Sequence, residues 1–180
     1  MKFTESPLPG VFVVDMASLE DERGFFARAY CREEFAAQGL GIEMRQCSVS
    51  HNLKKGTLRG LHYQRAPHEE HKLVRCTAGE IFDVVVDIRP RSASYRRWFG
   101  EKLTAQNHRS LFIPPGFAHG FVTLCDETEV YYMISISHAP EYSGGYRWND
   151  PAFGIEWPEV PSIISQRDAH FPLLGTSVDQ

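Results

Sequence analysis

Short apolar segments separated by turn residues make up most of the chain after residue 43. Within 129–137, for example, Val130, Ile134 and Ile136 share one face of an extended strand. Because no helical pattern intervenes, this spacing is typical of an antiparallel sandwich or barrel and not of βαβ units. Strands are predicted at 11–14, 25–30, 43–50, 57–64, 72–77, 80–88, 99–103, 110–113, 120–124 and 129–137, with a further strand at 153–157.

Two short helical segments complete this pattern. The stretch 31–40 (CREEFAAQGL) predicts a helix of about two to three turns that ends at Gly39 or Gly41. Ser165 is the predicted cap of another short helix near the C-terminus. We therefore expect one all-β domain over residues 1–180, with a few short helices at its periphery.

Composition and charge restrict the cellular location and the kinds of binding partner that we expect for this protein. The chain has 180 residues and a net charge of −4, which gives no electrostatic reason to expect nucleic acid or an anionic membrane surface as a partner. The longest apolar run, 81–88, is interrupted by Asp83 and Asp87, so no segment is long enough to span a bilayer. The N-terminal sequence lacks the apolar core of a signal peptide, and the four cysteines form no C-x-x-C pair. These features predict a cytoplasmic protein with free thiols.

The segment 56–64, GTLRGLHYQ, carries polar side chains on a predicted strand. Arg59, His62 and Gln64 are costly to bury unless they are paired or used. Gly60 indicates close approach by a ligand or another backbone. An edge strand with a solvated Arg59 and His62 is the alternative explanation.

Two other predicted strands carry polar residues on an apolar face. Lys72 shares a face with Val74 and Cys76, which is unusual unless the lysine lies at the mouth of a cavity. Tyr132 places a phenol on the apolar face of 129–137, and a buried phenol needs a hydrogen-bonding partner or a function.

A turn motif near the middle of the chain predicts the fold more closely. In IPPGFAHGF, the residues Pro114, Gly116 and His119 match the P-x-G-x-x-H pattern of the second cupin motif. The match predicts a cupin-type jelly-roll barrel, a fold that encloses a cavity for a small ligand.

The first cupin motif lacks a metal ligand in this chain. It needs an H-x-H pair, but Gln64 stands at the second ligand position after His62. Metal sites need three or four ligands of matching geometry, so no metal is predicted. Replacement ligands are available only at an unusual spacing, from Glu69, Glu70 and His71.

His62, Lys72 and Tyr132, with carboxylates nearby, suit proton abstraction next to a carbonyl group. A base removes the Cα proton, a cation stabilises the enolate oxygen, and an acid on the other face returns a proton. Protonation from the opposite face inverts the carbon, so the expected reaction is epimerisation. A metal-dependent cupin enzyme and a non-catalytic cupin that binds a sugar nucleotide are the alternatives.

Six segments occur in order between about residues 11 and 172: DERGFF, GTLRGLHYQ, KLVRCTAGEIFDVVVDIR, IPPGFAHGF, RWNDPAFGIEWP and SQRD. Together they resemble the RmlC family, the dTDP-4-dehydrorhamnose 3,5-epimerases and related nucleotide-sugar epimerases. The resemblance implies an enzyme without metal or organic cofactor that inverts C3, C5 or both of a nucleotide-linked 4-keto-6-deoxy sugar. It implies His62 as the general base, Asp168 as the carboxylate that orients it, Lys72 as the stabiliser of the enolate and Tyr132 as the general acid.

The resemblance also implies substrate-binding residues and a partner subunit. Arg59 and His119 match positions that hold the diphosphate and the sugar. Arg23 matches an arginine often contributed by the other subunit of a homodimer that exchanges N-terminal strands. The remaining candidate substrate-binding residues are Gln46 and Arg28.

Three positions depart from the family pattern. Arg28 replaces a usual glutamate that helps contact the nucleotide, Ser48 lies near a usual asparagine, and His138 replaces a usual second active-site tyrosine. A reversed charge at residue 28 changes which group is recognised there. The departures leave the nucleotide, the sugar and the number of inverted carbons open.

Several candidates also have a purely structural explanation. Ser165 and Asp168 have the S-x-x-D spacing of a capping box. Asp83 is a second candidate partner for His62. Tyr132 is alternatively an ordinary core tyrosine, and Arg23 a solvated turn residue.

Overall fold

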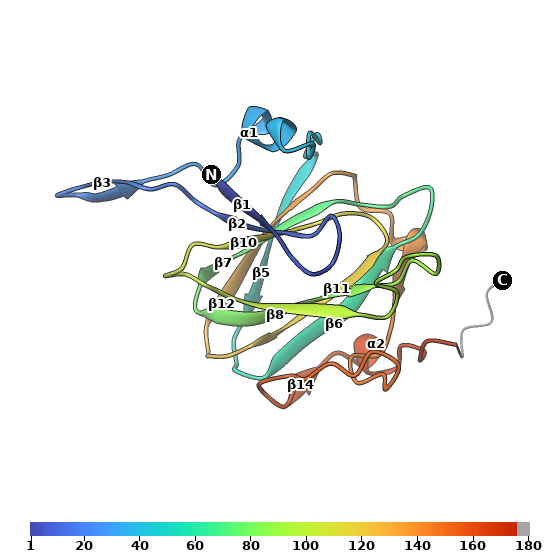
Figure 1. The fold of residues 1–180 in the computed structure, drawn as a ribbon. Coiled ribbons are helices and arrows are strands. Elements are labelled where there is room, and N and C mark those ends of the chain that lie inside the picture. The colour runs from blue at the N-terminus through green and yellow to red at the C-terminus, as the bar shows by residue number, and fades with distance from the viewer. Residues whose placement is uncertain (176–180) are drawn as a thin grey trace.

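Two largely antiparallel sheets face each other in the structure, a computed structural model that describes residues 1–175 (Figure 1). The first sheet has the spatial order β1 (Lys2–Glu5), β2 (Phe12–Asp15), β10 (Ser110–Ile113), β7 (Lys72–Ala78), β12 (Thr128–Ile134) and β5 (Gln46–Asn52). The second has the order β13 (Ser143–Gly145), β6 (Thr57–Gln64), β11 (Phe117–Thr123), β8 (Glu80–Asp87) and β9 (Trp98–Thr104). The short strand β14 (Ile163–Ile164) pairs in parallel with β6.

The main hydrophobic core lies between the two sheets. Val74 and Val130 from the first sheet pack with Val85 and Phe121 from the second, and all four side chains are buried. The alternation predicted for 129–137 is therefore confirmed, because the face that carries Val130 also carries Tyr132 into this core. Strand pairs in a jelly roll join distant parts of the chain, and this all-β architecture is the one that the sequence predicts.

Each sheet is also covered over part of its outer face. Helix α1 (Arg32–Ala37) lies over the first sheet, where Phe35 is fully buried against Phe112. Burial of a phenylalanine contributes about 2–3 kcal/mol to the free energy of unfolding. Over the second sheet, the irregular segment after β13 packs Phe153 and Trp157 onto the outer face. Along the chain, a short 3₁₀ helix, Pro140–Tyr142, lies between β12 and β13. Near the C-terminus lies α2 (Gln166–Ala169).

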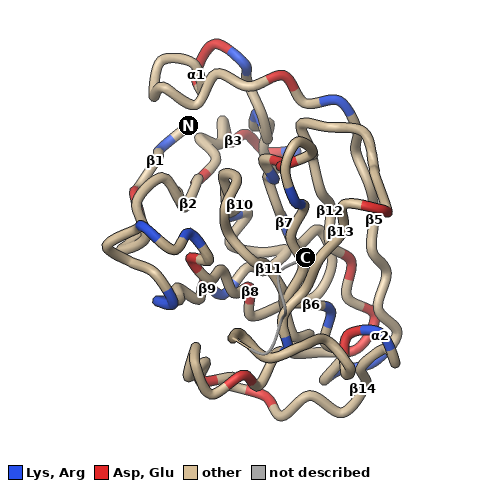
Figure 2. Tube along the Cα trace, turned by 90° about the vertical axis from the view of Figure 1, so that its right-hand side faces the viewer, with Lys and Arg blue, Asp and Glu red and all other residues tan. Residues whose placement is uncertain are grey.

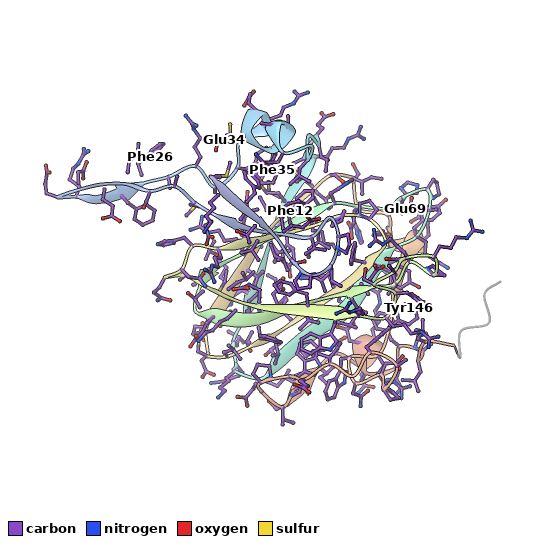
Figure 3. The ribbon with its side chains drawn as sticks, in the orientation of Figure 1. Phe12, Phe26, Glu34, Phe35, Glu69 and Tyr146 are labelled. Carbon is purple, nitrogen blue, oxygen red and sulfur yellow. The ribbon has the colours of Figure 1, made fainter. Side chains whose placement is uncertain are left out.

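A separate hairpin, β3 (Leu19–Asp21) and β4 (Gly24–Phe26), projects away from the body of the molecule (Figure 1). Its apolar side chains are exposed to solvent, with Leu19 at 74% and Phe26 at 73%. Figure 3 shows Phe26 out on this arm, whereas Phe35 lies beneath α1. Such exposure is unusual for large apolar side chains gathered on one element.

Two of the predicted strands are wrong, and the reasons are physical. Residues 25–30 form a strand only as far as Phe26, because the chain then leaves the hairpin and turns into α1. Residues 153–157 form no strand, since this segment buries its apolar side chains against the second sheet without pairing along it. The short strands β1, β3, β13 and β14 were not predicted.

Basic and acidic residues alternate along much of the described chain. Figure 2 shows basic and acidic positions interspersed along the trace, and α2 carries both. Within residues 1–175, no helix is long and apolar enough to cross a membrane.

Candidate active site

An extra residue in β6 brings Arg59 and His62 onto the same face. Strand β11 pairs His119 with His62 and Phe121 with Arg59, so three steps along β6 span only two along β11. Such a bulge reverses the alternation of side chains. Without it, positions 59 and 62 would point to opposite faces of the sheet.

Gly60 makes this bulge possible. Its φ is +137°, and a Cβ atom there would lie 2.6 Å from the Cα of Gly120 on the neighbouring strand. Only glycine fits such a backbone and such an approach. The close backbone approach predicted from the sequence is therefore confirmed, and the neighbour is β11.

His62 is hydrogen-bonded to a carboxylate far along the chain. Its Nε2 lies 2.9 Å from Asp168 Oδ1, and the backbone N–H of Gly60 donates to Oδ2 of the same carboxylate at 3.0 Å. The imidazole packs edge-on against Phe171, with 5.7 Å between the ring centroids. The bulge, His62 and Asp168 therefore form one connected unit.

Helix α2 holds Asp168 in place. The hydroxyl of Ser165 accepts a hydrogen bond from the Asp168 backbone N–H at 3.1 Å, as an N-cap does. The carboxylate of Asp168 meanwhile reaches His62. The capping by Ser165 is therefore confirmed, while the role of Asp168 in orienting a catalytic base stays a prediction that its contact with His62 is consistent with.

The charge of Asp168 fixes the tautomer of His62. Burial acts to raise the pKa of this carboxyl, but hydrogen bonds from His62, Gly60 and Ser165 outweigh burial and hold the pKa below its usual range. An ionised carboxylate only accepts hydrogen bonds, so Nε2 of His62 donates. Nδ1 is left with the lone pair that a general base needs.

Asp83 does not pair with His62, as one alternative proposed, but with His119. The distance between His119 Nε2 and Asp83 Oδ1 is 2.8 Å, and both side chains are buried. The reason is strand geometry, because both residues point into the barrel from the adjacent strands β8 and β11. The ring of Tyr132 lies edge-on to His119, with centroids 6.2 Å apart.

Tyr132 is kept in its neutral form by its surroundings. Burial raises the pKa of Tyr132 well above its usual range, the negative charge of Asp83 adds to the increase, and Arg59 opposes it. A phenol that stays protonated remains available to donate a proton.

These side chains surround a cavity of about 470 Å³. Arg59 is held there by Asn52, since its Nε donates to Asn52 Oδ1 at 2.7 Å. Lys72 lies 2.9 Å from Glu70, and their side chains are only 11% and 12% exposed. The predicted site residues on the cavity wall are Gln46, Arg59, His62, Lys72, His119 and Tyr132.

Two predicted substrate-binding residues lie away from this cavity. Arg23 is on the projecting hairpin, where it pairs with Asp21. Arg28 pairs with Glu34 of α1, 3.0 Å away, and lines a separate hollow at the base of the hairpin. Within one chain, the structure does not bring either residue to His62.

Some residues of the cavity wall were missed as site residues. Glu70 was considered only as a substitute metal ligand, although its position two residues before Lys72 indicates a pairing partner. Arg167 and Ser143 also line the cavity. Arg167 directly precedes Asp168, a sequence signal that was available, whereas nothing in the local sequence singles out Ser143.

The donor set of a metal site is not assembled here. Among the described residues, no three His, Cys, Asp or Glu side chains gather as a metal ion would require. Of the three histidines on the cavity wall, His62 and His119 are each engaged by a carboxylate, and Gln64 donates to the hydroxyl of Ser143.

A family model described as dTDP-4-dehydrorhamnose 3,5-epimerase matches residues 5–176. The chain belongs to this family. A dTDP-4-dehydrorhamnose 3,5-epimerase from Salmonella typhimurium is 43% identical over 177 residues, which make up 97% of this chain and 96% of the relative.

Solved structures of the epimerase family have the same fold. The enzyme from Bacillus anthracis, with TDP and PPi bound, has a TM-score of 0.93 and 36% identity, with coverage of 96% of this chain and 99% of that one. The enzyme from Legionella pneumophila, in complex with dTDP-4-keto-L-rhamnose, has a TM-score of 0.90 and 35% identity, covering 99% and 94%. Two of the three departures from the epimerase pattern, Ser48 and His138, lie on the cavity wall.

Proposed function

We propose that this chain inverts C3, C5 or both of a dTDP-linked 4-keto-6-deoxy sugar by moving protons next to the ketone. The observation that carries the proposal is that His62, 2.9 Å from Asp168, lines a cavity together with Lys72 and Tyr132. Membership of the epimerase family supports this reaction class.

In the proposed reaction, Nδ1 of His62 takes the proton from the carbon next to the ketone. The electron pair of the broken C–H bond moves to the ketone oxygen, and Lys72 stabilises the resulting enolate. Tyr132 then gives its phenolic proton to the opposite face of the same carbon, which inverts it. The histidine is left protonated and the tyrosine deprotonated, and exchange with solvent restores both.

The remaining polar groups of the cavity hold the substrate. Arg59 supplies a guanidinium suited to a phosphate group, and Asn52 fixes its direction. His119 and Gln46 offer hydrogen bonds from two other strands. Binding energy from the nucleotide part positions the sugar for the proton transfers.

Hydrogen exchange tests the reaction directly. We expect incubation with dTDP-4-keto-6-deoxyglucose in heavy water to place deuterium on the sugar, with NMR locating it. Deuterium at both C3 and C5 identifies a double epimerase, and deuterium at one carbon a mono-epimerase. If neither carbon exchanges, this function is wrong.

A second copy of the chain is the proposed partner. The projecting hairpin exposes Leu19 and Phe26, and the outer face of the first sheet carries a hollow of about 310 Å³ that includes Leu73, Tyr131 and Met133. We propose that the hairpins are exchanged between two copies. Exchange would cover these apolar surfaces and carry Arg23 toward the partner's cavity.

Light scattering on purified protein tests the dimer. The wild type is expected to be a dimer, and Phe26→Asp a monomer with weakened turnover. Val160→Asp is the matched control, since Val160 is 79% exposed in the C-terminal segment, and it should remain dimeric. A monomeric wild type, or a dimeric Phe26→Asp, would remove the proposed exchange.

We propose the cytoplasm as the location of the reaction. The cysteines, Cys31, Cys47, Cys76 and Cys125, are all free thiols, as expected in a reducing compartment.

A further inference from the structure

Lys72 is held by a nearly buried partner on the cavity wall. Its ammonium lies 2.9 Å from Oε1 of Glu70, and both side chains are close to nine-tenths buried. Breaking such a pair is costly, since the remaining charge would be left with little solvent. Glu70 is therefore a fixed part of the wall and not a mobile surface residue.

The contact with Glu70 restricts the direction of the Lys72 ammonium. The ammonium carries three N–H donors on a flexible four-carbon stem, so an unrestrained lysine has no fixed direction. One donor is taken by Glu70, which restricts the stem. The other two donors are left for groups that lie next to Lys72.

One of those groups is Gln64. Its Nε2 donates to Ser143 Oγ at 3.2 Å, while its Oε1 is buried and accepts no hydrogen bond from the described residues. A buried acceptor without a donor costs about 1–3 kcal/mol. A hydrogen-bond donor on the same cavity wall would therefore stabilise this oxygen.

A small hollow lies next to this acceptor. Its volume is about 10 Å³, and Gln64, Glu70 and Lys72 line it together with His119. A hollow of this size has room for about one water molecule, and a buried water is favoured where two to four polar groups surround it.

We propose that Glu70, with Gln64 and one ordered water in this hollow, positions the Lys72 ammonium for the enolate oxygen. Glu70 acts here as a positioning residue and does not touch the reacting carbon. The inference rests on the proposed epimerase function, because it concerns the cation of that same site.

The proposal requires an acceptor oxygen at position 70. Two variants distinguish the loss of this oxygen from the loss of the negative charge of Glu70. Glu70→Ala removes the acceptor, and we expect kcat to fall about 10- to 100-fold, as small misplacements of catalytic groups do. Glu70→Gln keeps an amide oxygen for the ammonium, so it should retain kcat within about 5-fold. In both variants the affinity for dTDP, measured by calorimetry, should stay within about 2-fold, because Lys72 is assigned to the sugar.

Glu69 provides the matched control. It is the adjacent residue in the same loop and is exposed to solvent, at the periphery of the molecule in Figure 3. Glu69→Ala makes the same change in charge and length and should leave kcat and dTDP affinity unchanged. Melting temperatures of all variants separate a loss of positioning from a loss of fold.

A double-mutant cycle tests whether the water links the two side chains. If Gln64 and Glu70 act on Lys72 through one network, Gln64→Leu combined with Glu70→Ala should lose less kcat than the product of the single losses. Ser143→Ala separates the contribution of the bond from Gln64 to Ser143. Fully multiplicative losses would overturn the shared network.

The outcomes also distinguish this inference from the proposed function. If wild-type protein exchanges no sugar hydrogen, the epimerase function itself is wrong. If the wild type turns over and Glu70→Ala matches it, or Glu70→Ala loses dTDP affinity together with kcat, only the positioning role is wrong.

Discussion

Two histidines on the cavity wall are each paired with an aspartate at a similar distance. The two pairs differ in their exposure to solvent and in the elements that supply the carboxylates. His62 and His119 are direct partners across β6 and β11, and their carboxylates are 2.9 Å and 2.8 Å away. The side chain of His62 is 39% exposed, whereas that of His119 is 5% exposed.

The origins of the two carboxylates explain the difference. Asp83 comes from β8, inside the same sheet as His119, so this pair is built into the core. Asp168 comes from α2, outside the barrel, and meets His62 where the bulge opens β6. A group that exchanges protons with substrate and solvent needs access, and only the first histidine has it. The exposed pair thus fits the proposed base, whereas the buried pair is a fixed part of the wall.

Replacing each histidine is the strongest test of this difference. We expect His62→Asn to lower kcat by about 1,000-fold or more, since loss of a general base costs about 100- to 10,000-fold. The protein should still fold and bind dTDP, as circular dichroism and calorimetry can show.

His119→Asn serves as the comparison at the neighbouring position. It should raise KM more than it lowers kcat, because its assigned role is to hold substrate. Equal losses of kcat in the two variants would erase the distinction between the pairs.

Replacing the carboxylate of the exposed pair comes next in size. Asp168→Asn should lower kcat by about 100-fold, because Nε2 of His62 loses the charge that fixes its tautomer and supports its protonated form. Steady-state kinetics in parallel with Asp83→Asn show whether the loss is specific to this pair.

The same variant has a pH signature. The pKa of Asp168 in the folded state lies below its usual range, so its stabilising contribution is present above the unfolded carboxyl pKa, about 4. That contribution is lost as the pH falls through the lower folded value. Urea unfolding from pH 7 down to pH 3 should therefore show a smaller acid loss of stability in Asp168→Asn than in the wild type.

Asp83→Asn probes the buried pair and should act through Tyr132. Burial first and the Asp83 charge second raise the pKa of Tyr132, so removal of that charge lowers it. Tyrosinate absorbance should show the Tyr132 titration beginning at lower pH in Asp83→Asn, with Tyr132→Phe as the background.

The variant should also lose about 2 kcal/mol of unfolding free energy. An unchanged Tyr132 titration would show that Asp83 does not set the protonation of the acid.

Ser165→Ala is the mildest change. Loss of an N-cap costs about 1 kcal/mol, and here the helix is short and carries Asp168. We expect a kcat reduction of only a few-fold, because Gly60 still donates to the carboxylate. A loss as large as that of Asp168→Asn would mean that the cap, and not the backbone N–H, places the carboxylate.

Where apolar alternation is regular, the strands followed from the sequence. β6 and β10 have the predicted bounds residue for residue, and β7 and β8 differ by one residue at an end. The short strands β13 and β14 carry no such signal, since they exist only because β6 offers an edge to pair with. The segment 153–157 has the apolar content of a strand but meets the face of a sheet and not its edge.

The site residues also divide into those that the sequence pattern reveals and those that it does not. The candidate residues His62, Lys72 and Tyr132 could be recognised because polar groups on an apolar strand face are costly without a role. Arg23 and Arg28 could not be placed, because the sequence does not show that the hairpin projects away from the cavity of its own chain (Figure 1).

What the sequence by itself determined was the longer barrel strands and which of their side chains face inward, because both follow from the two-residue period of a strand. Only the tertiary structure decided which charges meet. Asp168 lies 106 residues from His62, and the two meet because a bulge at Gly60 frees a backbone N–H and turns the imidazole toward α2. Asp83 was a second candidate in the sequence, and the register of β8 with β11 assigned it to His119 instead.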